Sequence, residues 1–327
     1  MYSPFFFYFL VVDTKICFST DFFFHNWEYM QKNGFFVQER NKIMSWYRRY
    51  LQVYEKNFDE MAFAEIISEV HSNLEKLQSD DPLVTVSIIA YNEEKHLLAC
   101  LWALSEMKTH YPVEIIGVDN DSTDRTADVY RAVGLPFYTE LQHSCGHARL
   151  CGLINARGKY HINIDADTLY PSTYVEAMID VMEKHSDVMG VSATWGYYPD
   201  KQHSRIGLYL YSFFRDCYLW IQSFKRPELS VRGLVFAYRT EEAKKVGINT
   251  RIIRGEDGSL AFGLRKYGRL AFLRKAKVRA VTGYGTVGGG SLSGSFWKRV
   301  LQALKKIKYM FTSAQEYKDE ESNLTKR

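Results

Sequence analysis

Residues 113–124 read VEIIGVDNDSTD, an apolar run that ends abruptly in acidic and hydroxyl side chains. VTVSIIA at 84–90 ends in the same way, in the Tyr-Asn-Glu of 91–93. A third run, YHINID at 160–165, alternates and ends in an Asp-Ala-Asp. Short apolar runs are typical of buried strands, and ligands bind where parallel strands end. The chain is therefore expected to be an α/β protein whose acidic side chains gather at one edge of a sheet.

Segments with a helical spacing of apolar residues separate these runs. Residues 93–107 carry leucines at positions 97, 98, 101 and 104, which line one side of a helix. Ser122 is expected to cap the following helix and Gly134 to end it. Further strands are expected at 137–139 and 188–193. Because strands and helices alternate, a doubly wound, mostly parallel sheet is predicted.

The acidic strand ends favour one kind of chemistry. Asp165-Ala166-Asp167 places two carboxylates at a strand end, and hard divalent cations take carboxylate oxygens as ligands. A cation beside loops rich in polar groups indicates a diphosphate. The chain is therefore interpreted as an enzyme that acts on a nucleotide-activated substrate.

From about Val84 to Leu273 the chain resembles the family 2 glycosyltransferases, inverting enzymes that use nucleotide sugars. The likeness rests on SIIAYNE (87–93), VDNDSTD (118–124), GHAR (146–149), DAD (165–167) and GEDGSLA (255–261). Leu150 departs from the family, which usually has Asn after that Arg. The resemblance implies a GT-A fold, a Rossmann-like and mostly parallel sheet flanked by helices, here with helical N- and C-terminal extensions.

The resemblance also implies roles for the acidic motifs. The departing diphosphate builds negative charge that Mn²⁺ or Mg²⁺ neutralises, with Asp167 as the first choice of ligand and Asp165 touching metal or ribose. Asp257 is expected to be the general base that takes the proton of the attacking acceptor hydroxyl. Glu256 beside it is the alternative base. Read alone, the Glu256-Asp257 pair also fits the start of a helix.

The nucleotide sugar is expected to lie on the first two strand ends. Tyr91 would stack on the base, while Asp119 and Asn120 would bond its edge or the ribose. Arg149 would counter the diphosphate charge. The full set expected to bind the donor is Ala90, Tyr91, Asn92, Glu93, Asp119, Asn120, Arg149 and Asp165.

The function implied is inverting transfer of a sugar from a nucleotide-diphosphate sugar to an acceptor hydroxyl, in cell-surface glycan or polysaccharide biosynthesis. A UDP-sugar is favoured as donor, and a glycan or lipid-linked molecule as acceptor. The Gln-x-x-Arg-Trp motif of processive synthases does not occur, which favours a single addition.

Three alternatives compete with this interpretation. VDNDST at 118–123 also opens like a haloacid-dehalogenase-type phosphatase, in which Asp119 would be the nucleophile. A non-catalytic, nucleotide-binding GT-A module would share every donor motif. A zinc site from His143, Cys145, His147 and Cys151 is disfavoured, because the spacing is not that of structural zinc sites.

Composition excludes several classes. The 327 residues suffice for one large domain with appendages, and a net charge of +4 is too mild to indicate nucleic acid. Five scattered cysteines disfavour a disulfide framework and favour a reducing, cytoplasmic setting.

The expected organisation has four parts. Residues 1–43 are expected to be a poorly structured or untranslated leader. Its apolar run is too short to span a membrane, because Asp13 and Lys15 interrupt it far short of the ~20 residues of a membrane span. Residues 44–82 form a helical extension. Residues 83–282 form the GT-A domain, with a donor half at 83–194 and an acceptor half at 195–282. Residues 283–327 hold a glycine-rich loop, an amphipathic basic helix and a polar tail.

For two segments the sequence leaves open whether a helix packs in the core or lies at the surface. The aromatic residues 203–224 have helical spacing and are expected to form a buried helix, with an acceptor wall or a membrane-facing surface as the alternative. The basic amphipathic segment 296–311 fits either a packed helix or one lying on an anionic bilayer, so peripheral association with the inner face of a membrane stays open.

Overall fold

The computed structural model describes residues 46–199, 205–252 and 255–283. Contacts divide the chain between Trp46 and Tyr47, and the sheets and the helices around them belong to the unit that begins at Tyr47. The expectations for the leader, the glycine-rich loop and the 296–311 helix lie outside the described residues.

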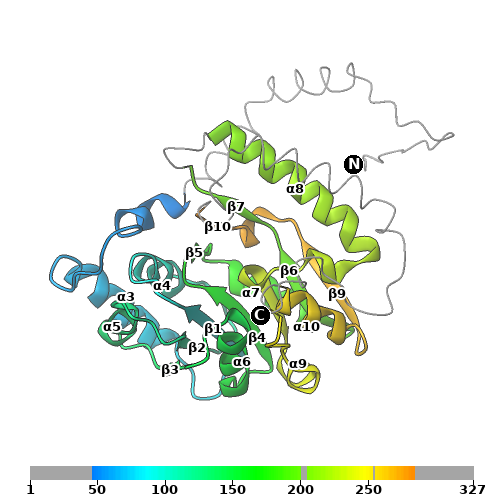
Figure 1. The fold of residues 1–327 in the computed structure, drawn as a ribbon, viewed down its shortest axis with the longest axis horizontal. Helices are drawn as coiled ribbons and strands as arrows, with labels where there is room; N and C mark the ends of the chain where they lie inside the picture. Colours follow the sequence, from blue (N-terminus) through cyan, green and yellow to red (C-terminus); the bar gives the residue numbers. More distant parts are fainter. Residues whose placement is uncertain (1–45, 200–204, 253–254, 284–327) are drawn as a thin grey trace. The chain divides into compact units, whose positions relative to one another are not determined.

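A seven-stranded sheet in the order β3-β2-β1-β4-β8-β6-β9 forms the centre of the fold (Figure 1). Its strands are β1 Val84–Ala90, β2 Val113–Asp119, β3 Phe137–Thr139, β4 Tyr160–Asp165, β6 Val188–Ala193, β8 Phe236–Arg239 and β9 Arg269–Leu273. β1 lies between β2 and β4, parallel to both. Only β8 runs antiparallel to its neighbours, β4 and β6. The predicted mostly parallel α/β sheet is confirmed.

Strand register places the polar strand ends level with one another. Ala90 pairs with Asp119 on one side of β1, and Ile89 pairs with Asp165 on the other. β1 itself is an almost completely buried VTVSIIA run, as a strand covered on both faces must be. The site is thus built where three parallel strands end together.

Helices pack around this sheet. They are α3 Ala64–Leu77, α4 Leu97–Ser105, α5 Thr126–Ala132, α6 Cys145–Asn155, α7 Tyr174–Lys184, α9 Thr240–Val246 and α10 Glu256–Leu264. α6 packs on β1 and β2, and α7 on β6. Gly152 permits the close approach of α6, because a Cβ there would lie 2.1 Å from the Ser87 hydroxyl oxygen.

Two expected helix starts were wrong, for one physical reason. α4 begins at Leu97, not near Glu93, and α5 begins at Thr126 without a cap from Ser122. The Ser122 hydroxyl instead accepts a hydrogen bond from the Asn92 amide at 2.9 Å. Polar side chains that could cap a helix are used to join two neighbouring loops.

A small sheet in the order β5-β10-β7 lies beside the carboxyl end of β4. It consists of β5 Thr168–Leu169, β7 Trp195–Tyr197 and β10 Ala280–Thr282, and the long helix α8 Arg205–Lys225 packs along β7 (Figure 1). Short 3₁₀ turns complete the chain: η1 Trp46–Gln52, η2 Pro227–Ser230, η3 Gly233–Val235 and η4 Ala276–Val278. Within the described ranges, no helix has the length and apolarity needed to cross a membrane.

The expected helical extension is only partly helical, because α3 is preceded by η1 and by turns. Residues 46–58, the leading segment ahead of α3, are nevertheless well anchored. Its buried apolar side chains are Tyr47, Tyr50, Val53, Tyr54 and Phe58. The Tyr50 hydroxyl donates to Glu106 at 2.7 Å, and Arg125 donates to the Phe58 carbonyl at 2.8 Å.

Two truncations test whether the folded unit begins between residues 44 and 58. We expect a chain that starts at Met44 to unfold cooperatively with an unchanged free energy. A chain that starts at Asp59 should lose at least about 4 kcal/mol, because it loses five buried apolar side chains. Urea unfolding followed by circular dichroism measures both. Equal stability of the two truncated chains would contradict this assignment.

Candidate functional site

The loops after β1 and β2 are bound together by polar side chains. The Thr123 amide donates to the Asn92 side-chain oxygen at 2.8 Å, and the Glu93 amide donates to the Thr126 hydroxyl at 2.8 Å. Asn92 adopts a left-handed backbone with φ of 55°, which Asn tolerates better than most residues. These loops form one rigid rim at the end of the sheet.

Asp119 and Asn120, at the end of β2, differ in how far their side-chain atoms are already hydrogen-bonded. Asp119 is buried, and its Oδ1 has no hydrogen-bond partner in the described part of the chain. The Asn120 side-chain nitrogen donates to the Glu140 and Gln142 carbonyls, and its oxygen accepts from the Ser144 amide at 3.0 Å. Asn120 therefore holds the next loop in place, while Asp119 keeps an acceptor oxygen.

An exposed aromatic side chain stands at this rim. Tyr91 is 50% exposed and contacts His143 edge to face at 5.1 Å between ring centroids. His143 in turn lies 3.3 Å from the Asp121 carboxylate. A flat molecule has access to the Tyr91 ring, because half of it faces solvent.

The Asp-Ala-Asp turn lies between β4 and β5 and is held from several directions. The Asp165 amide donates to the Tyr170 hydroxyl oxygen at 3.2 Å, and the Ala166 amide donates to the Ile89 carbonyl at 3.2 Å. The Asp167 carboxylate accepts from Thr168 at 2.9 Å. Backbone and hydroxyl contacts thus hold the turn in place and orient the Asp167 carboxylate.

Two distant residues bond the carbonyl oxygen of this turn. The Tyr54 hydroxyl donates to the Asp167 carbonyl at 2.6 Å, and the Thr282 hydroxyl donates to the same oxygen at 3.4 Å. Tyr54 also lies against His96, with ring centroids 4.6 Å apart. The leading segment is therefore part of the site, a contribution that no sequence motif indicated.

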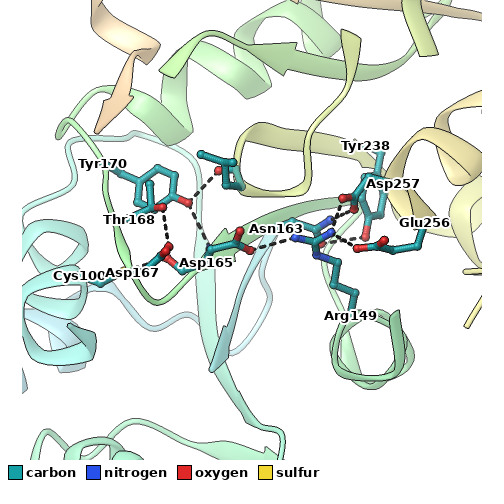
Figure 2. A network of polar contacts seen from close by, with 11 residues as sticks. Cys100, Arg149, Asn163, Asp165, Asp167, Thr168, Tyr170, Tyr238, Glu256 and Asp257 are labelled. Atoms are coloured by element: carbon teal, nitrogen blue, oxygen red, sulfur yellow. Dashed lines mark hydrogen bonds and ion pairs between the residues drawn. The ribbon is translucent and has the colours of Figure 1, made fainter. Parts of the chain in front are cut away.

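Arg149 joins the turn to the start of α10. Its guanidinium donates to Asp165 at 3.0 Å, to Glu256 at 2.6 Å and to Asp257 (Figure 2). The side chain is buried, as are Glu256 and Asp257. α6, β4 and α10 each supply a member of this cluster, so the structure brings together residues more than 100 positions apart.

Gly233 makes room for this arrangement. A Cβ at residue 233 would lie 2.0 Å from three atoms of the Arg149 guanidinium. The guanidinium therefore rests against the backbone of η3, and a side chain at residue 233 would displace it from this position.

The cluster has more negative than positive charge. One guanidinium faces three carboxylates, those of Asp165, Glu256 and Asp257. Burial raises the pKa of Asp257, and Glu256 adds to the rise while Arg149 opposes it. Asn163 lies 3.5 Å from the same carboxylate and also accepts from Tyr238 at 3.1 Å. Asp257 is thus held in place and has a greater tendency to take up a proton.

The Asp-Ala-Asp turn fits a divalent cation on grounds of charge. Burial and the neighbouring carboxylates of Asp165 and Glu93 raise the pKa of Asp167 to about 7. A divalent cation would relieve that repulsion, and carboxylate oxygens are its preferred ligands. Among the described residues no group of three His, Cys, Asp or Glu side chains is placed to hold a metal.

Comparisons with known proteins point to one family. The model described as Glycosyl transferase family 2 matches residues 85–232. The glycosyltransferase SunS of Bacillus phage SPbeta is 33% identical over 121 residues, which cover 36% of this chain and 26% of its own length. The uncharacterized glycosyltransferase RT0329 of Rickettsia typhi is 27% identical over 187 residues, 50% of this chain and 58% of that protein. The matches thus span about a quarter to just over half of these relatives.

A solved structure shares the fold. The mannosyltransferase PcManGT from Pyrobaculum calidifontis, in complex with GDP-Man and Mn²⁺, gives a TM-score of 0.50 at 19% identity. The superposition covers 76% of this chain and 73% of that chain. At this identity the likeness shows the fold.

Arg149→Lys tests how far the buried cluster depends on the guanidinium fork. A lysine keeps the charge but cannot bridge three carboxylates, so we expect a loss of about 3 kcal/mol in the free energy of unfolding. Arg131→Lys is the matched control, because Arg131 is exposed, bonds Asp128 on the same helix and lies over the Phe137 ring, without a buried carboxylate partner among the described residues. It should change the stability by less than about 0.5 kcal/mol. Denaturant titrations measure both, and equal effects would contradict the role of the fork.

Proposed function

Residues 85–232 form a glycosyltransferase domain of family 2, and from this premise we propose that the protein transfers a sugar from a nucleotide-diphosphate sugar to an acceptor hydroxyl with inversion. The observation that carries the proposal is the Arg149 cluster. It sets a buried acidic pair from α10 beside the Asp-Ala-Asp turn of β4. Sugar transfer needs carboxylates at both places. One set would hold the metal at the donor diphosphate, and the other would take the proton of the acceptor hydroxyl.

The nucleotide is proposed to bind at the rim formed by the β1 and β2 loops. Tyr91 offers a half-exposed ring for stacking on the base. The Asp119 Oδ1 offers one buried acceptor, which suits the single ring N–H of uracil. The Asn120 nitrogen is already engaged by two carbonyls and adds no donor. A UDP-sugar is therefore the favoured donor, with Ala90, Asn92 and Glu93 completing the rim.

Asp167, with Asp165, would hold Mn²⁺ or Mg²⁺. The cation would neutralise the charge that develops on the departing diphosphate. Arg149 would hold Asp165 in place through their bond at 3.0 Å, although its positive charge is already outweighed by three carboxylates. Tyr54 keeps the backbone of the turn in place through its bond to the Asp167 carbonyl.

Asp257 is proposed as the general base. It is the second residue of α10, a helix whose N-cap residue Gly255 adopts a left-handed φ of 96°. Its raised pKa favours proton uptake from an attacking hydroxyl. Glu256, the alternative base, is held by the same guanidinium at 2.6 Å.

The acceptor is proposed to be a glycan or a lipid-linked molecule in cell-surface glycan or polysaccharide biosynthesis, with one sugar added per encounter. Residues 195–282 would form the acceptor half, since they supply α8, α10 and two strands of the small sheet. Residues 83–194 would form the donor half.

The phosphatase alternative receives no support from the geometry. A phosphatase would use Asp119 and Asp121, but it would leave the Arg149 cluster and the Asp-Ala-Asp turn without a role. Asp121, the second aspartate of that motif, is half exposed and lies against His143. A non-catalytic module would bind the nucleotide sugar without turning it over. A product assay that compares the unchanged protein with an Asp257 variant distinguishes it from an enzyme.

Metal dependence is the first test of this function. We expect EDTA to abolish release of nucleotide from the donor sugar, and Mn²⁺ to restore it. Asp167→Ala should weaken binding of UDP in the presence of Mn²⁺ by at least about tenfold, because the metal loses a charged ligand. Isothermal titration with and without Mn²⁺ measures this. Undiminished turnover in a metal-stripped sample would refute the assignment.

Asp257→Asn separates chemistry from binding. The variant keeps the size of the side chain but cannot accept a proton, so transfer should fall by about 10²-fold or more while donor affinity changes little. Asp167→Ala should show the reverse pattern, in which donor binding itself is impaired. A product assay and nucleotide titrations measure both variants. If Asp257→Asn transfers at the normal rate, the base is Glu256 or the mechanism is not inverting.

A further inference from the structure

The outward face of α8 is apolar over its described length. Phe213, Trp220, Ile221 and Phe224 are 46%, 40%, 46% and 67% exposed. They lie on one arc of the helix, because residues three, four and seven positions apart share a side. We refer to these four side chains as the α8 patch. The expectation that the aromatic segment 203–224 is a buried helix was therefore right for only one of its two faces.

The opposite face of the same helix packs on the protein. Its buried residues include Leu208, Tyr211, Ser212, Asp216, Leu219 and Gln222. A surface helix normally reverses this pattern and shows polar side chains to water. On α8 the polar residues Ser212, Asp216 and Gln222 are buried, while Phe213, Trp220 and Phe224 are exposed. Core packing therefore does not explain the α8 patch.

Ring contacts link aromatic side chains at two places along the outward face of α8. The Trp220 and Phe224 rings meet edge to face at 5.3 Å, and Phe213 meets Phe214 in the same way at 5.6 Å. The Arg274 guanidinium lies 4.7 Å from the centre of the Trp220 ring. A contiguous apolar surface of this kind marks an interaction site on a protein.

Exposed basic side chains accompany the α8 patch in the described part of the chain. Lys225 at the end of α8 is exposed, as are Arg274 and Lys275 after β9. The single acidic residue of α8, Asp216, is buried and paired with Arg215 and Arg279. No carboxylate of the helix therefore faces outward beside the aromatic side chains.

We propose that the α8 patch docks this protein on an anionic lipid bilayer. Trp and Phe side chains insert at the boundary of headgroups and acyl chains, and basic side chains beside them attract anionic headgroups. A second copy of the chain fits less well. A two-fold contact through the same face would bring Lys225, Arg274 and Lys275 of both copies together without acidic partners. The inference stands on the described face of α8 alone and does not depend on sugar transfer.

Vesicle flotation of the full chain tests the proposal. Vesicles of phosphatidylcholine mixed with phosphatidylglycerol should carry the protein, and vesicles of phosphatidylcholine alone should carry much less. The variant Phe213→Ser/Trp220→Ser/Phe224→Ser should lower the partition coefficient on the anionic vesicles by at least about tenfold. These side chains lie outside the nucleotide rim and the Arg149 cluster, so nucleotide binding should be unchanged.

A matched variant controls for the loss of apolar surface. Met61→Ser/Ile154→Ser removes two exposed apolar side chains, 90% and 64% exposed, away from α8 and should bind vesicles as the unchanged protein does. Arg274→Gln/Lys275→Gln should weaken binding to the anionic vesicles and leave binding to neutral ones unaltered. Melting curves verify that each variant is folded.

Three results would overturn the proposal. The unchanged protein could fail to float with either kind of vesicle. The α8 variant could float as well as the unchanged protein, which would assign membrane binding to another segment. Light scattering could show a dimer that the α8 variant abolishes, which would assign the patch to a second copy of the chain. Each result leaves the glycosyltransferase proposal intact, because metal dependence and transfer are measured without vesicles.

Discussion

The geometry of the site depends on one buried guanidinium. Arg149 reaches from α6 to carboxylates on β4 and on α10, and it can do so because Gly233 leaves space for its flat face. A lysine ammonium would donate from a single nitrogen, whereas the planar guanidinium donates from Nη1 to the α10 pair and from Nη2 to Asp165. The relative positions of the Asp-Ala-Asp turn and of Asp257 depend on this contact.

Much of the fold can be predicted from patterns local in sequence. β1, β2 and β4 are recognisable because each is a short apolar run that stops at a polar cluster, and parallel pairing then places those clusters at one edge. The family resemblance was strong for the same reason, because its motifs are these strand ends. Roles assigned to individual members of the site remain predictions, although the structure does place most of them on that edge.

The features that the sequence did not indicate depend on contacts between distant residues. Ser122 has the chemistry of a helix cap, yet it bonds Asn92 in the neighbouring loop, a choice that only the folded arrangement decides. Arg149 was assigned to a diphosphate, and no local pattern indicates its carboxylate partners on α10. The outward face of α8 has the same periodicity as a buried one, so spacing alone did not distinguish the two.

The bond between Tyr54 and the Asp167 carbonyl has a consequence for the order in which the molecule forms. Tyr54 leaves the ribosome before its partner, which lies 113 residues later, and the Thr282 hydroxyl that shares this carbonyl comes later still. Contacts of such long sequence separation form slowly, since the intervening chain must first be ordered. The turn that presents Asp167 should therefore become rigid among the last steps of folding. The protein would have a formed sheet before it has a finished site.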